Sequence, residues 1–429
     1  MAGLKTTSVI RSKEDWTFLD ISTRDFTHGF HLYPARMHPE IAKRLIAKYA
    51  SDRKKVVFDP FMGSGGVLVE SLLHGNDSVG IDVNPMAVLL SKVKTTPLDS
   101  MKIQKEFEKI ILKSKVDYER KKFYDNAPKS IRLEFWYKKD VLEKLTILKH
   151  HITNPSIEKD IADFFKVCFS LVSRRASNQR NSIYKIYRMS KDDLVNFNPD
   201  VFDFFVDVYQ KNIAKMQQFR DETKNITAKA FPLLGDSRNI SKSFDKINIL
   251  DDGKAHLVVT SPPYGDHQTT VAYGQFSKHP GLWLDMPEDE LYDVDKIGLG
   301  GRKKKETREF DSPLLDSTID KVKKNDPNRA ADVHAYFYDL DICLEQISHS
   351  LKQGASHCCF VVANRTVRRI KIPTDQIIVE LGKKHGFRHK KTIFRTIANK
   401  AMASKNAPEN KTDLTGDTMT RESVVIWEF

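Results

Sequence analysis

The chain has 429 residues, of which 40% are hydrophobic and 30% are charged, and its 70 Lys and Arg exceed its 57 Asp and Glu, giving a formal net charge of +13. This length suggests two or three folding units with enough apolar residues for a real core, which excludes a disordered chain. The sequence has no run of roughly 18 apolar residues that would span a membrane and no apolar signal-peptide core, so we expect a cytoplasmic protein.

The positive charge is unevenly distributed along the chain. Residues 101–230 hold 27 basic and 18 acidic side chains, and residues 361–400 hold 11 and two, whereas residues 1–100 are nearly balanced with 13 and 11. Solvated surface lysines can produce such an excess in any basic protein. Two separate basic zones are also what a polyanionic partner such as nucleic acid would require.

Residues 54–95 are predicted to form a strand, a turn, a helix and a second strand. The apolar run before Asp59 predicts the first strand, the following glycines a turn, VLVESLLHG a helix ending near Gly75, and DSVGID the second strand. From about 100 to 225 the sequence becomes long, charged and helical in period. We therefore expect a βαβ half-unit followed by a helical insertion.

Strand and helix patterns alternate again after the insertion. AHLVVT at 255–260 is typical of a buried strand, 286–332 of a mobile loop because of its glycines and charge runs, and 336–354 of an amphipathic helix. Another strand at 356–364 and a helix at 374–387 follow. The pattern predicts an α/β fold with a doubly wound sheet, formed by residues 1–97 and 231–429 and interrupted by a helical region at 98–230.

The turn Asp59-Pro-Phe-Met-Gly-Ser-Gly-Gly66 stands where a strand passes into a helix, and its glycines let the backbone approach a ligand closely. Asp82 follows Asp59 by 23 residues, close to the spacing at which an acidic group binds ribose hydroxyls in dinucleotide folds. Glycines can serve such a turn through geometry alone, and this turn departs from GxGxxG and lacks the lysine of a phosphate-binding loop. Asp59 would repel a pyrophosphate but suit an ammonium group, which favours S-adenosylmethionine over NAD.

A second motif, Thr260-Ser-Pro-Pro-Tyr-Gly265, directly follows the strand at 255–260. Two consecutive prolines stiffen the turn and leave carbonyl oxygens free as acceptors. Ser261 and the Pro262 carbonyl could accept the hydrogens of an exocyclic amine, and Tyr264 could stack on the ring that carries this amine. A proline turn with a buried tyrosine is the structural alternative.

DPFMGSGG and TSPPYG together resemble the cofactor and catalytic motifs of the DNA amino-methyltransferases, the S-adenosylmethionine-dependent enzymes that methylate cytosine N4 or adenine N6 in restriction-modification systems. The segment His31–Arg36 is similar to the part of the family that closes over the methionine end of the cofactor. GIDVNP resembles the ribose-binding strand end, and LGDSR at 234–238 the strand end whose Asp contacts the adenine amine. The late segments RTIANKAMASKN and ESVVIWEF resemble the terminal strands of the same Rossmann-like domain.

The resemblance implies site residues for the cofactor and for catalysis. It assigns S-adenosylmethionine to Tyr33, Pro34, Asp59, Phe61, Gly63, Ser64, Gly65, Asp82, Asn84, Asp236 and Ser237. It assigns catalysis to Ser261, Pro262, Pro263 and Tyr264, and it requires no metal.

The order of motifs implies that the basic insertion between them recognises the target in double-stranded DNA. Its YKIYR stretch mixes bases and aromatics, and we expect DNA contacts from Arg174, Arg175, Arg180 and Arg188. A cognate restriction endonuclease is the expected further partner. The chain is not expected to contact a membrane.

The SPPY sequence favours cytosine N4 over adenine N6, because DPPY or NPPY accompanies adenine enzymes more often. Methylation of cytosine carbon 5 usually needs a cysteine in a Pro-Cys turn, and no Cys here follows Pro. An RNA or protein-amide methyltransferase and a DNA-binding module without catalysis remain alternatives. Tyr273, Phe276 and Trp283 could line the pocket for the target base or pack in the core.

The four cysteines, Cys168, Cys343, Cys358 and Cys359, are too few and too poorly spaced for a disulfide framework or a CxxC metal site. Cys358 and Cys359 fall within a predicted apolar strand, where they are expected to act as small buried hydrophobic residues.

Overall fold

A computed structural model describes residues 15–52, 55–245, 247, 254–265, 271–304, 310–397, 405–406, 416–417 and 420–429. Within these ranges, no helix is both long enough and apolar enough to cross a membrane.

A central sheet organises the molecule. In the described part of the chain it has seven strands in the order β3-β2-β1-β4-β5-β11-β8. Their bounds are β1 (Val57–Asp59), β2 (Ser78–Asp82), β3 (Ala230–Leu234), β4 (Leu257–Thr260), β5 (His357–Val362), β8 (Arg388–Thr396) and β11 (Arg421–Glu428). The strands from β3 to β5 run parallel, and β11 is antiparallel to both β5 and β8. Because the order reverses between β1 and β4, the sheet is doubly wound and Rossmann-like, as predicted.

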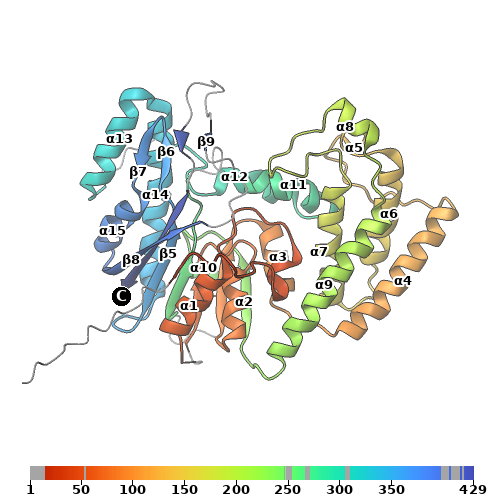
Figure 1. Cartoon of the computed structure of the whole chain (residues 1–429), viewed down its shortest axis with the longest axis horizontal. Helices are drawn as coiled ribbons and strands as arrows, with labels where there is room; N and C mark the ends of the chain where they lie inside the picture. The colour runs from red at the N-terminus through yellow and green to blue at the C-terminus, as the bar shows by residue number, and fades with distance from the viewer. Residues whose placement is uncertain are drawn as a thin grey trace, which may run out of the picture.

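Both faces of the sheet are buried, since successive strand residues pack into different cores. Phe58 and Val258 pack with helices α13 (Pro313–Asn325), α14 (Pro327–Ser350) and α15 (Thr374–Lys384). Their neighbours on the strands, Val57 and Leu257, pack on the opposite side with α1 (Pro39–Tyr49). Figure 1 shows α13, α14 and α15 on one side of the sheet and α1, α2 and α3 on the other. This double cover explains why the strands are continuous apolar runs rather than alternating ones.

The predicted strand, turn, helix and strand at 54–95 are confirmed as β1, α2 (Gly66–Leu73) and β2, followed by α3 (Pro85–Lys94). The Asn84 side chain caps α3 by accepting a hydrogen bond from the Met86 amide, and Pro85 occupies the first helical turn. The remaining helices around the sheet are η1 (Phe26–Phe30), α10 (Ser241–Phe244), α11 (Tyr273–Trp283) and α12 (Glu288–Ile297).

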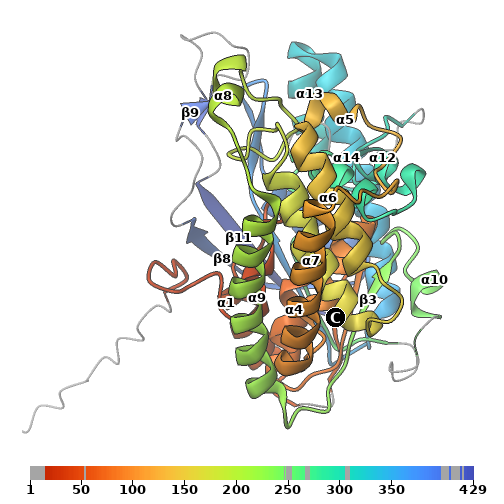
Figure 2. The ribbon, with the colours of Figure 1, turned by 90° about the vertical axis from the view of Figure 1, so that its right-hand side faces the viewer.

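Residues 100–223 are mostly helical, as the sequence indicates. The helices are α4 (Ser100–Glu119), α5 (Leu133–Trp136), α6 (Lys139–Ile152), α7 (Lys159–Arg175), α8 (Lys191–Asn196) and α9 (Val201–Thr223). They form a bundle at the end of the molecule away from α13 and α15 (Figure 1), and this end faces the viewer in Figure 2. Their core is continuous with Phe30, Met86 and Phe276, so the bundle packs directly on the elements that follow β2 and β4.

The interpretation of residues 286–332 as a mobile loop is wrong for most of that range, which contains α12 and α13. Leu291 and Val294 bury one face of α12. The Ser312 hydroxyl caps α13 by accepting from the Leu315 amide, with Pro313 in the first turn. The sequence pattern does not reveal these helices, because each has only a few buried apolar residues among long charged stretches. Residues 305–309 lie outside the described ranges.

The other predicted elements are present as β4, α14, β5 and α15, and the terminal segment ESVVIWEF is β11. RTIANKAMASKN begins in β8, and most of its remainder lies outside the described residues. Short two-stranded sheets complete the described structure, formed by β6 (Arg365–Val367) with β7 (Ile370–Ile372) and β9 (Lys405–Asn406) with β10 (Gly416–Asp417).

Candidate active site

A cavity of about 410 Å³ opens at the carboxyl ends of β1 and β4, where the strand order reverses. Ligands bind at this place in doubly wound sheets because neighbouring loops diverge there to opposite faces. The volume is within the range of small-molecule sites. All the sequence-predicted cofactor residues except Gly65 line the cavity, and so do Ser261 and Pro263 of the predicted catalytic corner.

The glycine-rich turn forms the wall between β1 and α2. Gly63 and Gly65 have φ of 48° and 74°, in the left-handed region that glycine favours. A Cβ on Gly65 would come within 2.7 Å of the Ser91 hydroxyl and 3.0 Å of the Ser91 Cα, so this glycine lets the turn pack against α3 rather than contact the cavity. Lys94 donates a 2.7 Å hydrogen bond to the Ser64 carbonyl and holds the turn from α3.

Two carboxylates lie at the ends of β1 and β2. Asp59 accepts hydrogen bonds from the Thr260 hydroxyl at 2.6 Å and the Phe61 amide at 3.1 Å. Asp82 accepts from the Gly63 and Asn84 amides at 2.9 and 2.8 Å. Burial raises the pKa of Asp59 to about 7 and that of Asp82 to about 6, against the hydrogen bonds that favour their charged forms. Burying a carboxylate without a counter-charge is costly. Asp59 and Asp82 therefore suggest a ligand that supplies an ammonium group and hydroxyls.

Asp236 and Ser237 follow β3 and border the same cavity. The Arg238 guanidinium donates to both oxygens of Asp236 and also forms a 3.0 Å ion pair with the buried Asp339. The Ser237 hydroxyl donates to the Pro60 carbonyl, which ties the end of β3 to the glycine-rich turn. Asp236 is therefore held at the cavity edge with its side chain 41% exposed.

The segment that contains Tyr33 and Pro34 covers the cavity from the N-terminal side. The Tyr33 hydroxyl accepts a 3.1 Å hydrogen bond from Asn84, which also donates to Ser277 at 2.7 Å. Asn84 thus has both a capping role at α3 and a role in holding Tyr33. The Tyr33 ring lies 3.4 Å from the position of a Cβ on Gly63, so it rests against the glycine-rich turn.

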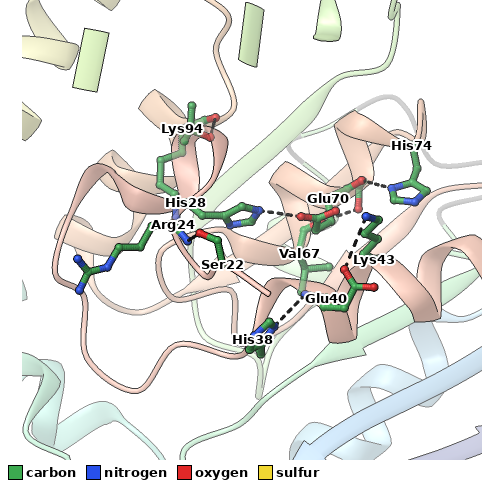
Figure 3. Close-up of polar contacts among 12 residues, drawn as sticks. Ser22, Arg24, His28, His38, Glu40, Lys43, Val67, Glu70, His74 and Lys94 are labelled. Carbon is green, nitrogen blue, oxygen red and sulfur yellow. Dashed lines mark hydrogen bonds and ion pairs between the residues drawn. The ribbon is translucent and has the colours of Figure 1, made fainter. Parts of the chain in front are cut away.

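Beside this segment lies a polar cluster that the sequence did not predict, composed of His28, Arg36, Glu70 and Lys94. His28 Nε2 is 2.8 Å from Glu70 Oε1, and Figure 3 shows these side chains facing each other with Lys94 nearby. Arg36 donates a 2.6 Å hydrogen bond to the His28 carbonyl. Burial lowers the pKa of Lys94 well below its usual value, and the Arg36 charge lowers it further. His28, Arg36 and Lys94 line the cavity, and Arg36 places a positive charge on this side of it.

The predicted catalytic corner follows β4 and is held from several directions. Ser261 Oγ is 3.1 Å from the Val361 carbonyl and 3.2 Å from the Tyr264 hydroxyl, and its single hydrogen can be donated to either. The Tyr264 hydroxyl donates to Glu422 at 2.9 Å, and the Tyr336 hydroxyl donates to the Pro263 carbonyl at 2.7 Å. Ser261 and Pro263 face the cavity, and Pro262 is buried.

The aromatic residues after the corner have different positions. Tyr273 lines the cavity, with its ring centroid 5.9 Å from that of Tyr33. Phe276 and Trp283 belong to the core that α11 shares with the helical bundle. Tyr184 from the insertion also reaches the cavity, and its ring packs edge-on to Phe276 at 5.8 Å.

The four arginines predicted to contact DNA are not equivalent. Arg174 is only 4% exposed and donates to the Ile183 carbonyl at 2.6 Å, so the interpretation of this residue as a surface contact is wrong. Arg175 pairs with Asp207 at 3.1 Å, and Arg188 donates to the Phe135 carbonyl at 2.9 Å, both half-buried. Arg180 is exposed.

Arg180 and Arg188 belong to a hairpin over residues 178–189, which we call the tyrosine hairpin. Its two arms are joined by hydrogen bonds from the Arg180 amide to the Tyr187 carbonyl and from the Met189 amide to the Asn178 carbonyl, both 2.8 Å. Tyr184 and Tyr187 are 48% and 55% exposed on it. The YKIYR stretch, which mixes bases and aromatics, lies in this hairpin.

All four cysteines are buried and none forms a disulfide. Burial raises the pKa of Cys168 to about 12 and the pKa values of Cys358 and Cys359 above their usual range. A thiolate nucleophile is therefore disfavoured, in agreement with the sequence. The described residues contain no cluster of His, Cys, Asp and Glu suited to a metal ion.

The cavity fits S-adenosylmethionine by its chemistry. The cofactor has an ammonium group, a carboxylate, ribose hydroxyls and a sulfonium, and the cavity presents carboxylates at Asp59 and Asp82, a cation at Arg36 and an aromatic ring at Phe61. The carboxylates of Asp59 and Asp82, which border the cavity at the ends of β1 and β2, most directly match this ligand.

Comparison with known proteins agrees with this chemistry. The model of a family described as DNA methylase matches residues 6–93. The chain is 37% identical over 427 residues to the type II methyltransferase M.MvaI of Kocuria varians, covering 95% of this chain and 92% of that protein. It is 32% identical over 108 residues to the type II methyltransferase M.MjaII of Methanocaldococcus jannaschii, covering 24% of this chain and 20% of that protein.

Among solved structures, the rRNA methyltransferase aviRa of Streptomyces viridochromogenes aligns with a TM-score of 0.33 and 10% identity, over 93% of this chain and 88% of that chain. This likeness is too low to support an argument. The similarity to M.MvaI extends along nearly the whole of both proteins, so it includes the cofactor turn, the insertion and the catalytic corner. The chain belongs to the DNA amino-methyltransferases of restriction-modification systems, and its methyl donor is S-adenosylmethionine.

Proposed function

We propose that this protein methylates the N4 amine of a cytosine that has been flipped out of duplex DNA. The observation that carries the proposal is the position of Ser261, whose hydroxyl lies at the end of β4 and faces the cavity lined by Asp59 and Asp82. The SPPY sequence favours cytosine over adenine within the family. A neutral hydroxyl as the first acceptor distinguishes this corner from the carboxylate or amide of DPPY and NPPY.

The cofactor, when bound, supplies an electrophilic sulfonium methyl group. We assign its ammonium group to Asp59, its ribose hydroxyls to Asp82 and the adenine amine to Asp236, and we place Tyr33 and Pro34 over its methionine end. Phe61, Gly63 and Ser64 contribute the wall of the turn, and Asn84 and Ser237 hold Tyr33 and the turn in place. Gly65 acts through its packing on Ser91.

The catalytic corner acts on the target amine, which is a weak nucleophile because its lone pair is delocalised into the base. Ser261 and the Pro262 carbonyl accept the amine hydrogens and favour a pyramidal nitrogen whose lone pair can attack in line. Tyr264 stacks on the base, and the Tyr336 hydroxyl fixes the Pro263 carbonyl behind it. No covalent enzyme intermediate is required.

DNA binding is assigned to the helical insertion, with the tyrosine hairpin facing the duplex. Its free end presents Arg180, Tyr184 and Tyr187, while Arg174 and Arg188 hold its base and Arg175 is paired with Asp207. An exposed cation can bind a phosphate, and exposed aromatic rings can stack on bases. Extruding a base costs roughly a few kcal/mol, which contacts of this kind can offset.

Mass spectrometry of nucleosides tests the proposed base. DNA from a host without methylated bases is incubated with the purified protein and S-adenosylmethionine, and we expect N4-methylcytosine to accumulate. N6-methyladenine in its place would overturn the choice of base, and methylation of RNA or protein without methylation of DNA would overturn the substrate. The Ser261→Ala variant serves as the control for contaminating methyltransferases.

A cognate restriction endonuclease would act on the same site in the cytoplasm of the host. If so, genomic DNA from cells that express this protein resists that endonuclease, and DNA from cells that express Ser261→Ala is cleaved. Sequencing the methylated bases in the same cells identifies the shared site.

A further inference from the structure

Glu422 is an acidic residue that neither the sequence motifs nor the family assignment gives a role. It lies at the start of β11, and its carboxylate lines the cavity together with Ser261. Because β11 is antiparallel to β5, it begins at the edge where the parallel strands end. The first residues of β11 therefore reach the ligand-binding edge of the sheet, although they are among the last of the chain.

Glu422 contacts the catalytic corner through the side chain of Tyr264. Its Oε1 accepts the hydroxyl hydrogen of Tyr264 at 2.9 Å, and the Tyr264 oxygen is 3.2 Å from Ser261 Oγ. With its own hydrogen donated to Glu422, the Tyr264 oxygen is left as an acceptor for the serine hydrogen. A chain of donors can thus run from Ser261 through Tyr264 to the carboxylate, and the Val361 carbonyl, 3.1 Å from Ser261 Oγ, is a second acceptor for the serine hydrogen.

The other oxygen of Glu422 is held in place. Arg395, opposite Glu422 on β8, binds Oε2, and Arg395 Nε donates at 2.9 Å to the Trp16 carbonyl. The side chains of Arg395 and Glu422 are only 3% and 12% exposed, so water competes little for this ion pair. Burial, together with the Glu422 charge, raises the pKa of Tyr264 well above its usual value, which keeps the phenol protonated as a donor.

We propose that Glu422 is a positioning residue for methyl transfer: it orients the Tyr264 hydroxyl so that Ser261 donates its hydrogen away from the cavity and keeps its lone pairs for the target amine. A serine that instead donated toward the amine would oppose the attack. This inference rests on the catalytic role proposed for Ser261 and Tyr264.

A double-mutant cycle on Glu422 and Tyr264 tests the inference. Single-turnover methyl transfer is measured with labelled S-adenosylmethionine on genomic DNA from a host without methylated bases. We expect Glu422→Gln to lower the rate at saturating cofactor and DNA by tenfold or more, up to the roughly hundredfold cost of misplacing a reacting group, with little change in cofactor affinity. Tyr264→Phe should lower the rate similarly, and adding Glu422→Gln to it should cause little further loss.

Glu428→Gln is the matched control, since Glu428 lies on the same strand and pairs with Arg388 on β8, away from the cavity. Its rate should equal that of the native protein. Equal losses from Glu422→Gln with and without the Tyr264 hydroxyl would overturn the inference, because Glu422 would then act only by joining β8 to β11. If Glu422→Gln does not fold, the double variant Glu422→Gln/Arg395→Met, which lacks both charges, takes the place of Glu422→Gln in the cycle.

The two proposals fail in different ways. Full activity in Ser261→Ala and Tyr264→Phe would refute the catalytic corner and the role of Glu422 with it. Low activity in both, together with a native rate in Glu422→Gln, would refute the role of Glu422 alone.

Discussion

The Thr260 hydroxyl donates a 2.6 Å hydrogen bond to Asp59 Oδ1, and this bond joins the ends of β1 and β4, between which the strand order reverses. Asp59 begins the glycine-rich turn, and Thr260 directly precedes Ser261. The bond therefore fixes the position of the cofactor turn relative to the catalytic corner. It also supplies one of the few interactions that favour the charged form of a buried carboxylate.

Cofactor affinity should increase with pH because Asp59 must lose its proton to bind an ammonium group. Its pKa is raised to about 7, so affinity measured by calorimetry should rise about tenfold between pH 6 and pH 8. Asp59→Asn should bind more weakly and without this rise. A native affinity that stays constant over this range would contradict the assignment of the ammonium group to Asp59.

Ionisation of Asp59 should strengthen cofactor binding but destabilise the protein without cofactor. Because the folded pKa of Asp59 lies above its ordinary value of 3.8, its contribution to the free energy of unfolding is complete below about pH 4 and is lost as pH rises through 7. Asp59→Asn should therefore gain stability relative to the native protein between pH 5 and pH 8. Urea unfolding at several pH values, without cofactor, measures this difference.

Gly65→Ala should destabilise the protein by at least about 2 kcal/mol. The alanine Cβ would meet Ser91 at 2.7 to 3.0 Å, and the left-handed backbone adds a cost of about 1–2 kcal/mol. Gly66→Ala is the matched control: its Cβ would meet no atom within 4 Å, and alanine favours the helix that begins there. Equal unfolding free energies for the two variants would contradict this account of the turn.

Lys94→Met should weaken cofactor binding by about tenfold, because the Ser64 carbonyl would lose its buried donor and the turn its anchor on α3. Lys92→Met on the same helix is the control. Lys92 pairs with Asp160 and Asp163, both at 2.8 Å, in the insertion, so its loss should lower stability without changing cofactor affinity. Equal cofactor affinities in both variants, measured by calorimetry, would show that the Lys94 contact is unimportant for binding.

The sequence predicted the doubly wound sheet and placed the candidate site motifs at strand ends, because both depend on local patterns. Asp59, Asp82 and Ser261 each stand where an apolar strand ends, and the carboxyl ends of parallel strands share one edge. Glu422 was not found, since its place depends on β11 running antiparallel, and nothing in ESVVIWEF shows that direction. Lys94 was not found because a lysine near the end of a helix normally faces solvent.

The burial of Arg174 could have been predicted from the sequence. Val167 and Leu171 are buried on α7, and Arg174 follows them by seven and three residues, on the same face of the helix. Helical phase therefore favours a buried Arg174, although its neighbours Arg175 and Arg180 suggest a basic surface. Composition alone groups Arg174 with Arg180, whereas helical phase identifies Arg174 as buried.

Arg180→Gln and Arg174→Met should have contrasting effects. Arg180 is exposed on the tyrosine hairpin, so its loss should weaken DNA binding and reduce the slope of log affinity against log salt by about one, with the free energy of unfolding unchanged. Arg174 lies beneath the hairpin over the Phe276 ring at 4.7 Å, so its loss should destabilise the protein by roughly 2 kcal/mol. Fluorescence anisotropy with duplex DNA at several salt concentrations and urea unfolding measure the two quantities. An unchanged salt slope in Arg180→Gln would show that the hairpin does not face the phosphates.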